Sequence, residues 1–112
     1  MLGAQHELSN VVAIVDVNGQ QALGYTSDVV NLSPLAEKWR AFGWQVREVD
    51  GHNEAALHEA LEADGGVQCP RVVLAQTVFG KGVPFMEGQI KWHYLPMSDD
   101  EYIVALRAIG AV

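Results

Sequence analysis

The sequence has 112 residues, of which 49% are hydrophobic and 19% charged, and its net charge is −7. These values are typical of one globular domain, here residues 1–112. The acidic balance and the lack of any Lys or Arg run exclude nucleic acid and anionic membranes as expected partners. The longest apolar run is too short to cross a bilayer, and a single cysteine, Cys69, fits a reducing compartment. We expect a cytoplasmic protein.

The first segments predict the end of a helix followed by a buried strand. Residues 1–9 carry Leu2 and Leu8 among polar residues, with no capping residue ahead of them, so we interpret them as the last turns of a helix cut short. Residues 11–15 are an apolar, mostly β-branched run without alternation, which predicts a strand covered on both faces. A polar loop is expected at residues 16–21.

The next segments predict a helix and a strand. Ser33 is expected to cap a helix over residues 34–42, with Pro34 at its first position and Gly43 at its end. The alternating residues 44–49 predict the strand that follows. Three aromatic residues are interpreted as core between this helix and this strand: Trp39, Phe42 and Trp44.

The remaining elements continue the alternation of helices and strands. Asn53 is expected to cap a helix that runs to about residue 63, before a flexible break at Gly65 and Gly66. Pro70 precedes a predicted strand over residues 71–76. An irregular stretch over residues 77–97 is expected next. Residues 98–101 resemble a capping box, which predicts a last helix that ends at Ile109.

This order of elements predicts an α/β fold with about three parallel strands, flanking helices and right-handed crossovers. A sheet of three strands has two edges with unpaired backbone groups. Such a sheet normally continues into more strands or has its edges covered by a partner, and self-association to a homodimer is an arrangement we expect.

The loop after the first strand is a candidate metal site. Ligands of open α/β sheets bind beyond the carboxyl ends of strands. The side chain of Asn18 and the backbone carbonyl of Gln20 are hard oxygen ligands that suit magnesium, if the chain turns at Gly19. Asn-Gly is also a common turn dipeptide, so the loop alone leaves a plain turn open.

Two further stretches are weaker candidates. Glycines in residues 77–83 allow close approach of the backbone to a phosphate, but the spacing matches neither a Walker loop nor a dinucleotide fingerprint. His93, within the irregular stretch, could donate to a phosphate or transfer a proton, or be an exposed loop residue. No spacing predicts a zinc site. The other histidines are interpreted as surface or local capping residues: His6, His52 and His58.

Four segments together resemble the transketolase family. They are VDVNGQQALG at residues 15–24, PLAEKWRAFGW at residues 34–44, EVDGHN at residues 48–53 and TVFGKGVPFME at residues 77–87. The pair Trp92-His93 is similar to a tryptophan–histidine pair of that family. The resemblance covers nearly all 112 residues in order.

The resemblance implies a thiamine-diphosphate-binding fold, specifically the C-terminal half of the family's N-terminal cofactor-binding domain. Asn18 would be the side-chain ligand and Gln20 the backbone ligand of the magnesium ion that holds the diphosphate. His93 would be a catalytic and cofactor-binding residue that reaches the diphosphate or the sugar substrate. The implied reaction is transfer of a two-carbon ketol unit between sugar phosphates, with chemistry supplied by the cofactor.

The sequence also departs from the family pattern. The Gly-Asp-Gly motif with the acidic magnesium ligand, and the separate domain with the activating glutamate, do not occur in these 112 residues. Phe79 stands where many relatives have a lysine, and Tyr94 where many have a glycine. We therefore expect a fragment or subunit part of a transketolase-like enzyme that binds magnesium and thiamine diphosphate weakly or not at all alone, and is inactive until complemented by the missing transketolase pieces. The alternative is a non-catalytic ligand- or protein-binding module derived from that fold.

Overall fold

The computed structural model describes residues 1–62 and 67–111, and the chain divides into two compact units. One unit comprises residues 1–17 and 32–77 and contains the parallel sheet. The other comprises Asn18–Asn31 and Val78–Val112 and is built largely of loops and short elements. We call them the sheet unit and the loop unit and describe each by itself.

The sheet unit contains three parallel strands, as the sequence predicts, and their order is β1-β5-β4. Their bounds are Val12–Val17 for β1, Gln45–Asp50 for β4 and Arg71–Gln76 for β5. Strand β5 lies in the centre, and its first five residues are all buried. A continuous apolar run thus becomes the central strand, because only a strand with neighbours on both sides and cover on both faces can bury every side chain.

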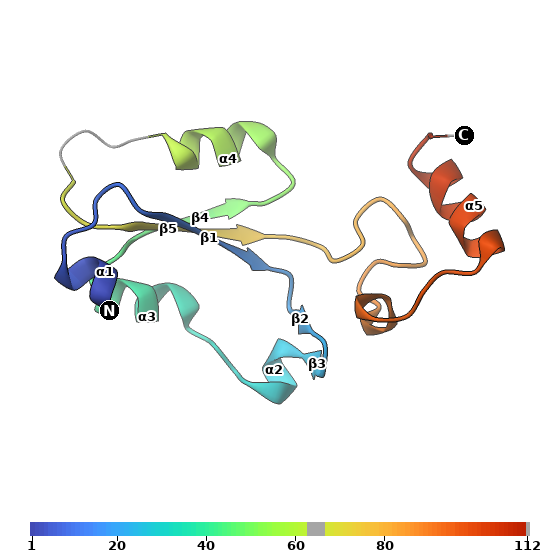
Figure 1. The fold of residues 1–112 in the computed structure, drawn as a ribbon, viewed down its shortest axis with the longest axis horizontal. Coiled ribbons are helices and arrows are strands. Elements are labelled where there is room, and N and C mark those ends of the chain that lie inside the picture. Colours follow the sequence, from blue (N-terminus) through green and yellow to red (C-terminus); the bar gives the residue numbers. More distant parts are fainter. Residues whose placement is uncertain (63–66, 112) are drawn as a thin grey trace. The chain divides into compact units, whose positions relative to one another are not determined.

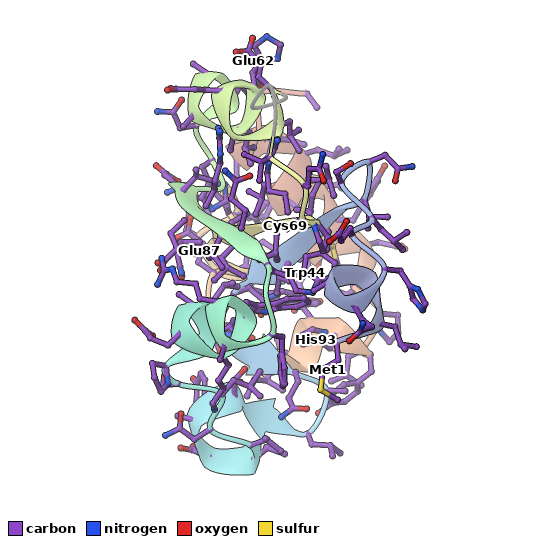
Figure 2. All side chains as sticks on the ribbon, turned by 90° about the vertical axis from the view of Figure 1, so that its left-hand side faces the viewer. Met1, Trp44, Glu62, Cys69, Glu87 and His93 are labelled. Carbon is purple, nitrogen blue, oxygen red and sulfur yellow. The ribbon has the colours of Figure 1, made fainter. Side chains whose placement is uncertain are left out.

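Two helices cover the sheet from opposite faces: α3 (Leu35–Ala41) and α4 (Glu54–Leu61) (Figure 1). The core beneath α3 centres on Ala36, Val72 and Leu74. Trp39 and Trp44 pack against this core with their rings edge to face, 4.9 Å between centroids, and Trp44 is marked in Figure 2. The prediction of an aromatic core between helix and strand is confirmed for these two residues.

Phe42, the third residue of the predicted aromatic core, is 49% exposed. Its position as the C-cap of α3 explains this, because the helix ends here and the chain turns at Gly43, whose φ is +81°, before it enters β4. That left-handed conformation is accessible to glycine at little cost. The helix therefore ends where predicted, but the last aromatic side chain of the segment lies outside the core.

Strand β1 is covered on one face only, which corrects the prediction of two covered faces. The side chains of Ala13, Val15 and Val17 pack on the core, whereas Val12 is 42% and Ile14 59% exposed. Helix α4 packs over β4 and β5. The strand also extends beyond the predicted residues 11–15, so that Asp16 belongs to it rather than to a loop.

Helix starts follow the predicted capping residues in two of three places. Asn53 caps α4 by accepting a hydrogen bond from the Ala56 amide at 3.1 Å, and Ser98 and Glu101 form the predicted capping box. Ser33 is not the cap of α3, because the N-cap position is taken by Pro34, after a cis Ser33–Pro34 peptide bond. Helix α4, predicted to run to about residue 63, ends at Leu61 with Glu62 as its C-cap. The predicted break at residues 65–66 lies outside the described residues.

The N-terminal helix is shorter than predicted. Helix α1 covers Leu2–Gln5, whereas the sequence indicated residues 1–9. Glu7 adopts a positive φ of 50°, and the amide of Ser9 donates to the Glu7 carbonyl at 2.7 Å. A non-glycine residue in this conformation ends a right-handed helix, so residues 6–9 form turns.

The loop unit contains short elements that the sequence did not reveal. Strands β2 (Gln20–Gln21) and β3 (Gly24–Tyr25) form an antiparallel hairpin, followed by α2 (Thr26–Val29). A 3-10 helix, η1 (Ile90–His93), interrupts the irregular stretch. Helix α5 (Asp99–Ala108) ends within one residue of its predicted end. A membrane span would need a far longer apolar helix than any that the described residues form.

Candidate functional site

The predicted turn at the candidate magnesium loop is present. Asn18, the residue after β1, accepts a hydrogen bond at its Oδ1 from the backbone amide of Gln20 at 2.9 Å. Gly19 has a φ of +72°, and a Cβ at this position would meet no atom within 4 Å, so glycine is needed for its backbone conformation alone. The side-chain oxygen of Asn18 is thus held by the turn.

The backbone carbonyl of Gln20 points away from its hairpin partner. The Thr26 amide donates to the Gly19 carbonyl at 2.9 Å, and Gln20 lies opposite Tyr25 in the register. Hydrogen-bonded and non-hydrogen-bonded pairs alternate along an antiparallel ladder, so Gln20 and Tyr25 form a non-hydrogen-bonded pair. The Gln20 carbonyl is therefore directed outward, as a ligand would require.

The side chain of Gln20 is also unusual. Its Oε1 atom is buried and has no hydrogen-bond partner among the described residues. Its Nε2 atom lies 3.7 Å from the position of a Cβ added at Gly88. Buried polar atoms normally have a partner, and a water molecule or ligand group fulfils this role where the protein does not.

The two oxygen donors, Asn18 Oδ1 and the Gln20 carbonyl, fit a magnesium ion that also binds phosphate. Magnesium prefers oxygen ligands, keeps several waters and uses substrate phosphates in its coordination shell. Within residues 1–62 and 67–111, no group of three or more His, Cys, Asp or Glu side chains could hold a metal ion. Asn18 and Gln20 can therefore contribute two neutral ligands, and a negatively charged ligand of the magnesium ion must come from another group.

The glycine-rich stretch closes on itself. The Gly88 amide donates to the Phe79 carbonyl at 3.0 Å, and the Gly82 amide donates to Glu87 Oε1 at 3.1 Å. Gly80 has a φ of +75°, and a Cβ there would lie 2.8 Å from the backbone of Met86. The glycines at 80 and 82 therefore serve the loop's own closure, a requirement that the sequence pattern alone does not distinguish from phosphate binding.

His93 ends η1 with an exposed side chain. Its ring stacks on the ring of Phe79, with centroids 4.4 Å apart and an interplanar angle of 20°. The neighbouring Trp92 donates from its indole Nε1 to the Phe85 carbonyl at 3.2 Å. His93 is marked in Figure 2. The loop unit thus contains all three predicted site residues, and β2 contacts η1 within it.

The two lysines of the stretch from residue 78 to residue 97 differ in whether they form an ion pair. Lys91 forms an ion pair with Glu101 at 3.5 Å, and its Nζ lies 4.1 Å from the centroid of the Trp92 ring. Lys81 is exposed and has no ion-pair partner among the described residues. The pKa of the Glu101 carboxyl is lowered, chiefly by the hydrogen bond from the Ser98 backbone and then by the Ser98 hydroxyl.

The carboxyl ends of the strands in the sheet unit carry a polar contact that the sequence analysis missed. The Thr77 hydroxyl, just after β5, donates to Asp16 Oδ1 on β1. Gly51 follows β4, and its amide donates to the Gln76 carbonyl at 2.7 Å. Polar residues directly after adjacent parallel strands are the signal that could have located this contact. The hydrogen bond between Thr77 and Asp16 joins the ends of β5 and β1, from which the loops depart.

Other candidate residues of the sequence analysis have surface or structural roles. His6, His52 and His58 are exposed in the sheet unit, as predicted, and His58 pairs with Glu62 at 3.4 Å when protonated. Cys69 is a half-buried free thiol.

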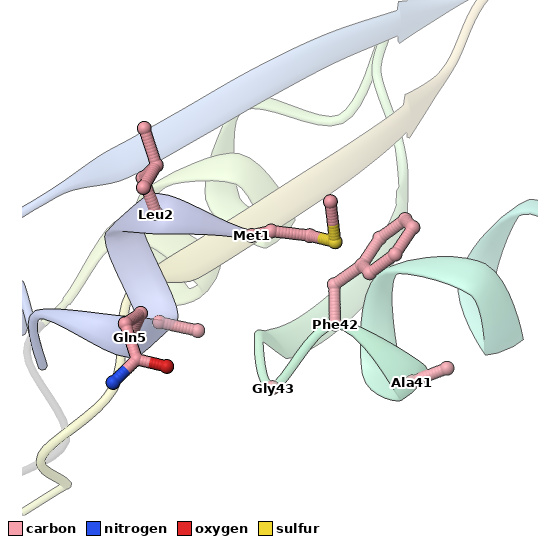
Figure 3. Close-up of a pocket in the computed structure, with 7 residues that line it drawn as sticks. Met1, Leu2, Gln5, Ala41, Phe42 and Gly43 are labelled. Carbon is pink, nitrogen blue, oxygen red and sulfur yellow. The ribbon is translucent and has the colours of Figure 1, made fainter.

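A pocket of about 530 Å³ lies between α1 and the end of α3 (Figure 3). The side chains of Met1 and Phe42 point toward each other across it. A Cβ at Gly3 of α1 would contact Trp44 and Pro70, which immediately precede β4 and β5. The pocket is therefore near the amino ends of these strands, at the edge opposite to that where α/β sheets bind ligands.

Comparison with known protein families decides the relationship. Residues 1–111 match the family model described as "Transketolase, thiamine diphosphate binding domain". The chain belongs to the transketolase family. The resemblance inferred from the sequence motifs is thereby confirmed.

Its relatives include proteins named as subunits. The chain is 36% identical over 110 residues to a 6-deoxy-6-sulfo-D-fructose transketolase subunit of Clostridium sp. (strain MSTE9), covering 95% of this chain and 39% of that protein. It is 36% identical over 111 residues to an apulose-4-phosphate transketolase subunit of Phocaeicola vulgatus, covering 98% of this chain and 40% of that protein. The chain therefore spans about 40% of the length of these relatives.

The fold is also that of the family. A crystal structure of transketolase from Campylobacter jejuni matches with a TM-score of 0.87 and 27% identity, covering 97% of this chain and 17% of that one. The predicted α/β fold with three parallel strands and flanking helices is confirmed.

Proposed function

We propose that this chain contributes part of the magnesium and diphosphate site for thiamine diphosphate in a transketolase-like enzyme assembled from more than one piece. The match to the thiamine-diphosphate-binding domain over residues 1–111 carries this proposal. Two relatives are named as transketolase subunits, which supports a function that depends on a partner. The substrate class is a sugar phosphate.

In this function, each predicted residue has a defined role. Asn18 Oδ1 and the Gln20 carbonyl would bind the magnesium ion, and the Asn18–Gln20 hydrogen bond of 2.9 Å would orient the first of them. A ring nitrogen of His93 would donate a hydrogen bond to a phosphate oxygen of the cofactor or the sugar. Thiamine diphosphate, when bound, supplies the chemistry of ketol transfer, and the protein binds and orients it.

The isolated chain is expected to bind the cofactor weakly. Asn18 and Gln20 would supply two neutral oxygens and no charged ligand, and the described residues contain no group of three or more His, Cys, Asp or Glu side chains that could hold the ion. We also expect no ketol transfer by the chain alone, because whole-length relatives are about two and a half times as long as the part matched here.

Calorimetry with thiamine diphosphate and magnesium tests the site. We expect binding weaker than micromolar, which Asn18→Ala weakens further by at least about tenfold, the loss typical of disrupted metal sites. Asn18→Asp should tighten the magnesium-dependent binding because it adds a charged ligand. Asn10→Ala is the matched control outside the loop. Micromolar or tighter binding by the original chain would contradict the weak-site reasoning, and equal effects of the Asn10 and Asn18 variants would contradict the site itself.

A coupled assay with a ketose phosphate and an aldose phosphate tests activity. We expect no turnover above the protein-free control for the chain alone. Turnover that disappears in Asn18→Ala would show that the chain is a complete enzyme.

The second candidate function is that of a protein-binding module, and the exposed face of β1 favours it. Val12 and Ile14 are exposed side by side on one face of an edge strand. Pairing of two copies would cover such a face, and light scattering after size exclusion measures it. A monomer mass at every concentration would exclude a homodimer and leave a different partner chain as the occupant of this face.

A further inference from the structure

The stack of Phe79 on His93 joins two segments of the loop unit. The ring centroids are 4.4 Å apart and the planes are inclined by 20°, so the contact is face to face. Phe79 is half-buried, whereas His93 is exposed. One face of the imidazole is therefore covered by the phenyl ring, while the edge that carries the two ring nitrogens stays accessible.

Both segments of the stack are fixed by other contacts. The Phe79 carbonyl accepts a hydrogen bond from the Gly88 amide at 3.0 Å, which closes the glycine-rich loop at this residue. A second ring pair, Phe85 and Trp92, has centroids 5.4 Å apart, and the Trp92 indole donates to the Phe85 carbonyl at 3.2 Å. The loop and η1 are thus joined at two places, and the His93 ring packs on a fixed support.

The stack is the contact that orients the His93 ring. The ring forms no hydrogen bond with any other residue of the described ranges. Its nitrogens are therefore unengaged, and rotation about the side-chain bonds is limited by the phenyl ring. Offset or stacked aromatic pairs are stabilising beyond their buried area.

We propose that Phe79 is a positioning residue for His93: its ring fixes the plane of the imidazole so that a ring N–H donates to an oxygen of an anionic phosphate group. This inference rests on the proposed function, in which His93 binds a phosphate. Phe79 itself contributes no charge. Ordering a side chain in advance removes the entropic cost of ordering it on binding, a gain of about two- to tenfold in affinity.

The test uses the full 112-residue chain with inorganic pyrophosphate and magnesium as the probe. Phe79→Leu keeps an apolar side chain but removes the ring, and Phe79→Tyr keeps the ring. Each is compared with the original chain and in a His93→Ala background. Two quantities are measured by NMR: the ring-proton shifts of His93, which report the stack, and the dissociation constant of pyrophosphate. Circular dichroism confirms that each variant is folded.

We expect Phe79→Leu to move the His93 ring protons downfield and to weaken the binding of pyrophosphate by about two- to tenfold. In the His93→Ala background, Phe79→Leu should cause no further loss of affinity. Phe79→Tyr should leave both quantities close to those of the original chain. Unchanged His93 shifts in Phe79→Leu would overturn the proposal, as would an equal loss of affinity without His93. If the shifts show the stack but the original chain does not bind pyrophosphate, the proposed phosphate site fails and the role of Phe79 fails with it.

Discussion

Arg71 is the residue whose replacement should reveal most about how the sheet unit is held together. It is the one charged residue that is buried among the described residues, with 7% exposure, and it lies at the start of the central strand β5. Its Nη1 donates to the carbonyls at the end of α4, at 3.3 Å to Ala60, 3.2 Å to Leu61 and 2.6 Å to Glu62. A cation is thus placed at the negative end of the helix dipole.

The magnitude follows from these contacts. A partly buried cation at a helix C-terminus stabilises by up to about 2 kcal/mol. The Nε of Arg71 also donates to Gln45 Oε1 at 3.0 Å, a half-buried acceptor. The loss of that bond costs about 1 kcal/mol. Arg71→Met keeps most of the packing of the side-chain stem, so we expect the free energy of unfolding to fall by about 2–3 kcal/mol.

Urea denaturation followed by circular dichroism measures this difference, and Arg47→Met is the matched control. Arg47 also donates to a carbonyl of α4, that of Glu59 at 2.7 Å, but this bond is exposed. Water can replace an exposed donor, so we expect a loss of at most about 1 kcal/mol for the control. Equal losses for the two variants would refute the reasoning that burial makes the Arg71 contacts important.

Three further outcomes are expected. Gly80→Ala should lower the free energy of unfolding by about 2 kcal/mol or more, because an alanine here combines a left-handed conformation with a clash against the Met86 backbone. Gly19→Ala, with open space around it, should lower it by about 1 kcal/mol, and urea denaturation measures both. The stabilisation from Glu101, whose pKa is lowered, should be complete above the ordinary glutamate pKa and be lost as the pH falls through the lowered value. Hydrogen exchange of α5 amides against pH measures it, and the same pH profile in Glu101→Gln, which has no titrating carboxyl, would contradict the assigned source. Gln20→Met should leave magnesium-dependent binding of thiamine diphosphate unchanged, because the proposed ligand is the backbone carbonyl, and a loss in calorimetry would assign the ligand role to the side chain.

The elements that the sequence predicted well are those whose residues determine their own structure. Strand β5 coincides with the predicted residues 71–76, because an apolar run this dense is stable only at the centre of a sheet. The start of α5 was found because Ser98 and Glu101 satisfy each other's backbone and side-chain groups locally. The turn at Asn18 was found for the same reason.

The features that were missed depend on contacts between segments distant in sequence. The run at residues 11–15 cannot show whether a helix covers both of its faces, since this depends on the position of α4. The stack of Phe79 on His93 links two loops, and neither residue type indicates it. The hairpin at Gln20 and the helix η1 are too short for periodicity to reveal.

Only one face of β1 is covered within the chain. The tolerance of β1 residues to substitution can therefore report whether a partner covers the other face in the cell. In a saturation library scored for abundance, polar residues should be rejected at Ala13 and Val15, which face the core. At Val12 and Ile14 the structure itself imposes no such demand, because both are largely exposed. If variants with polar residues at these two positions are depleted from the library, a partner that covers this face is present in the cell. This result would not require the partner to be purified.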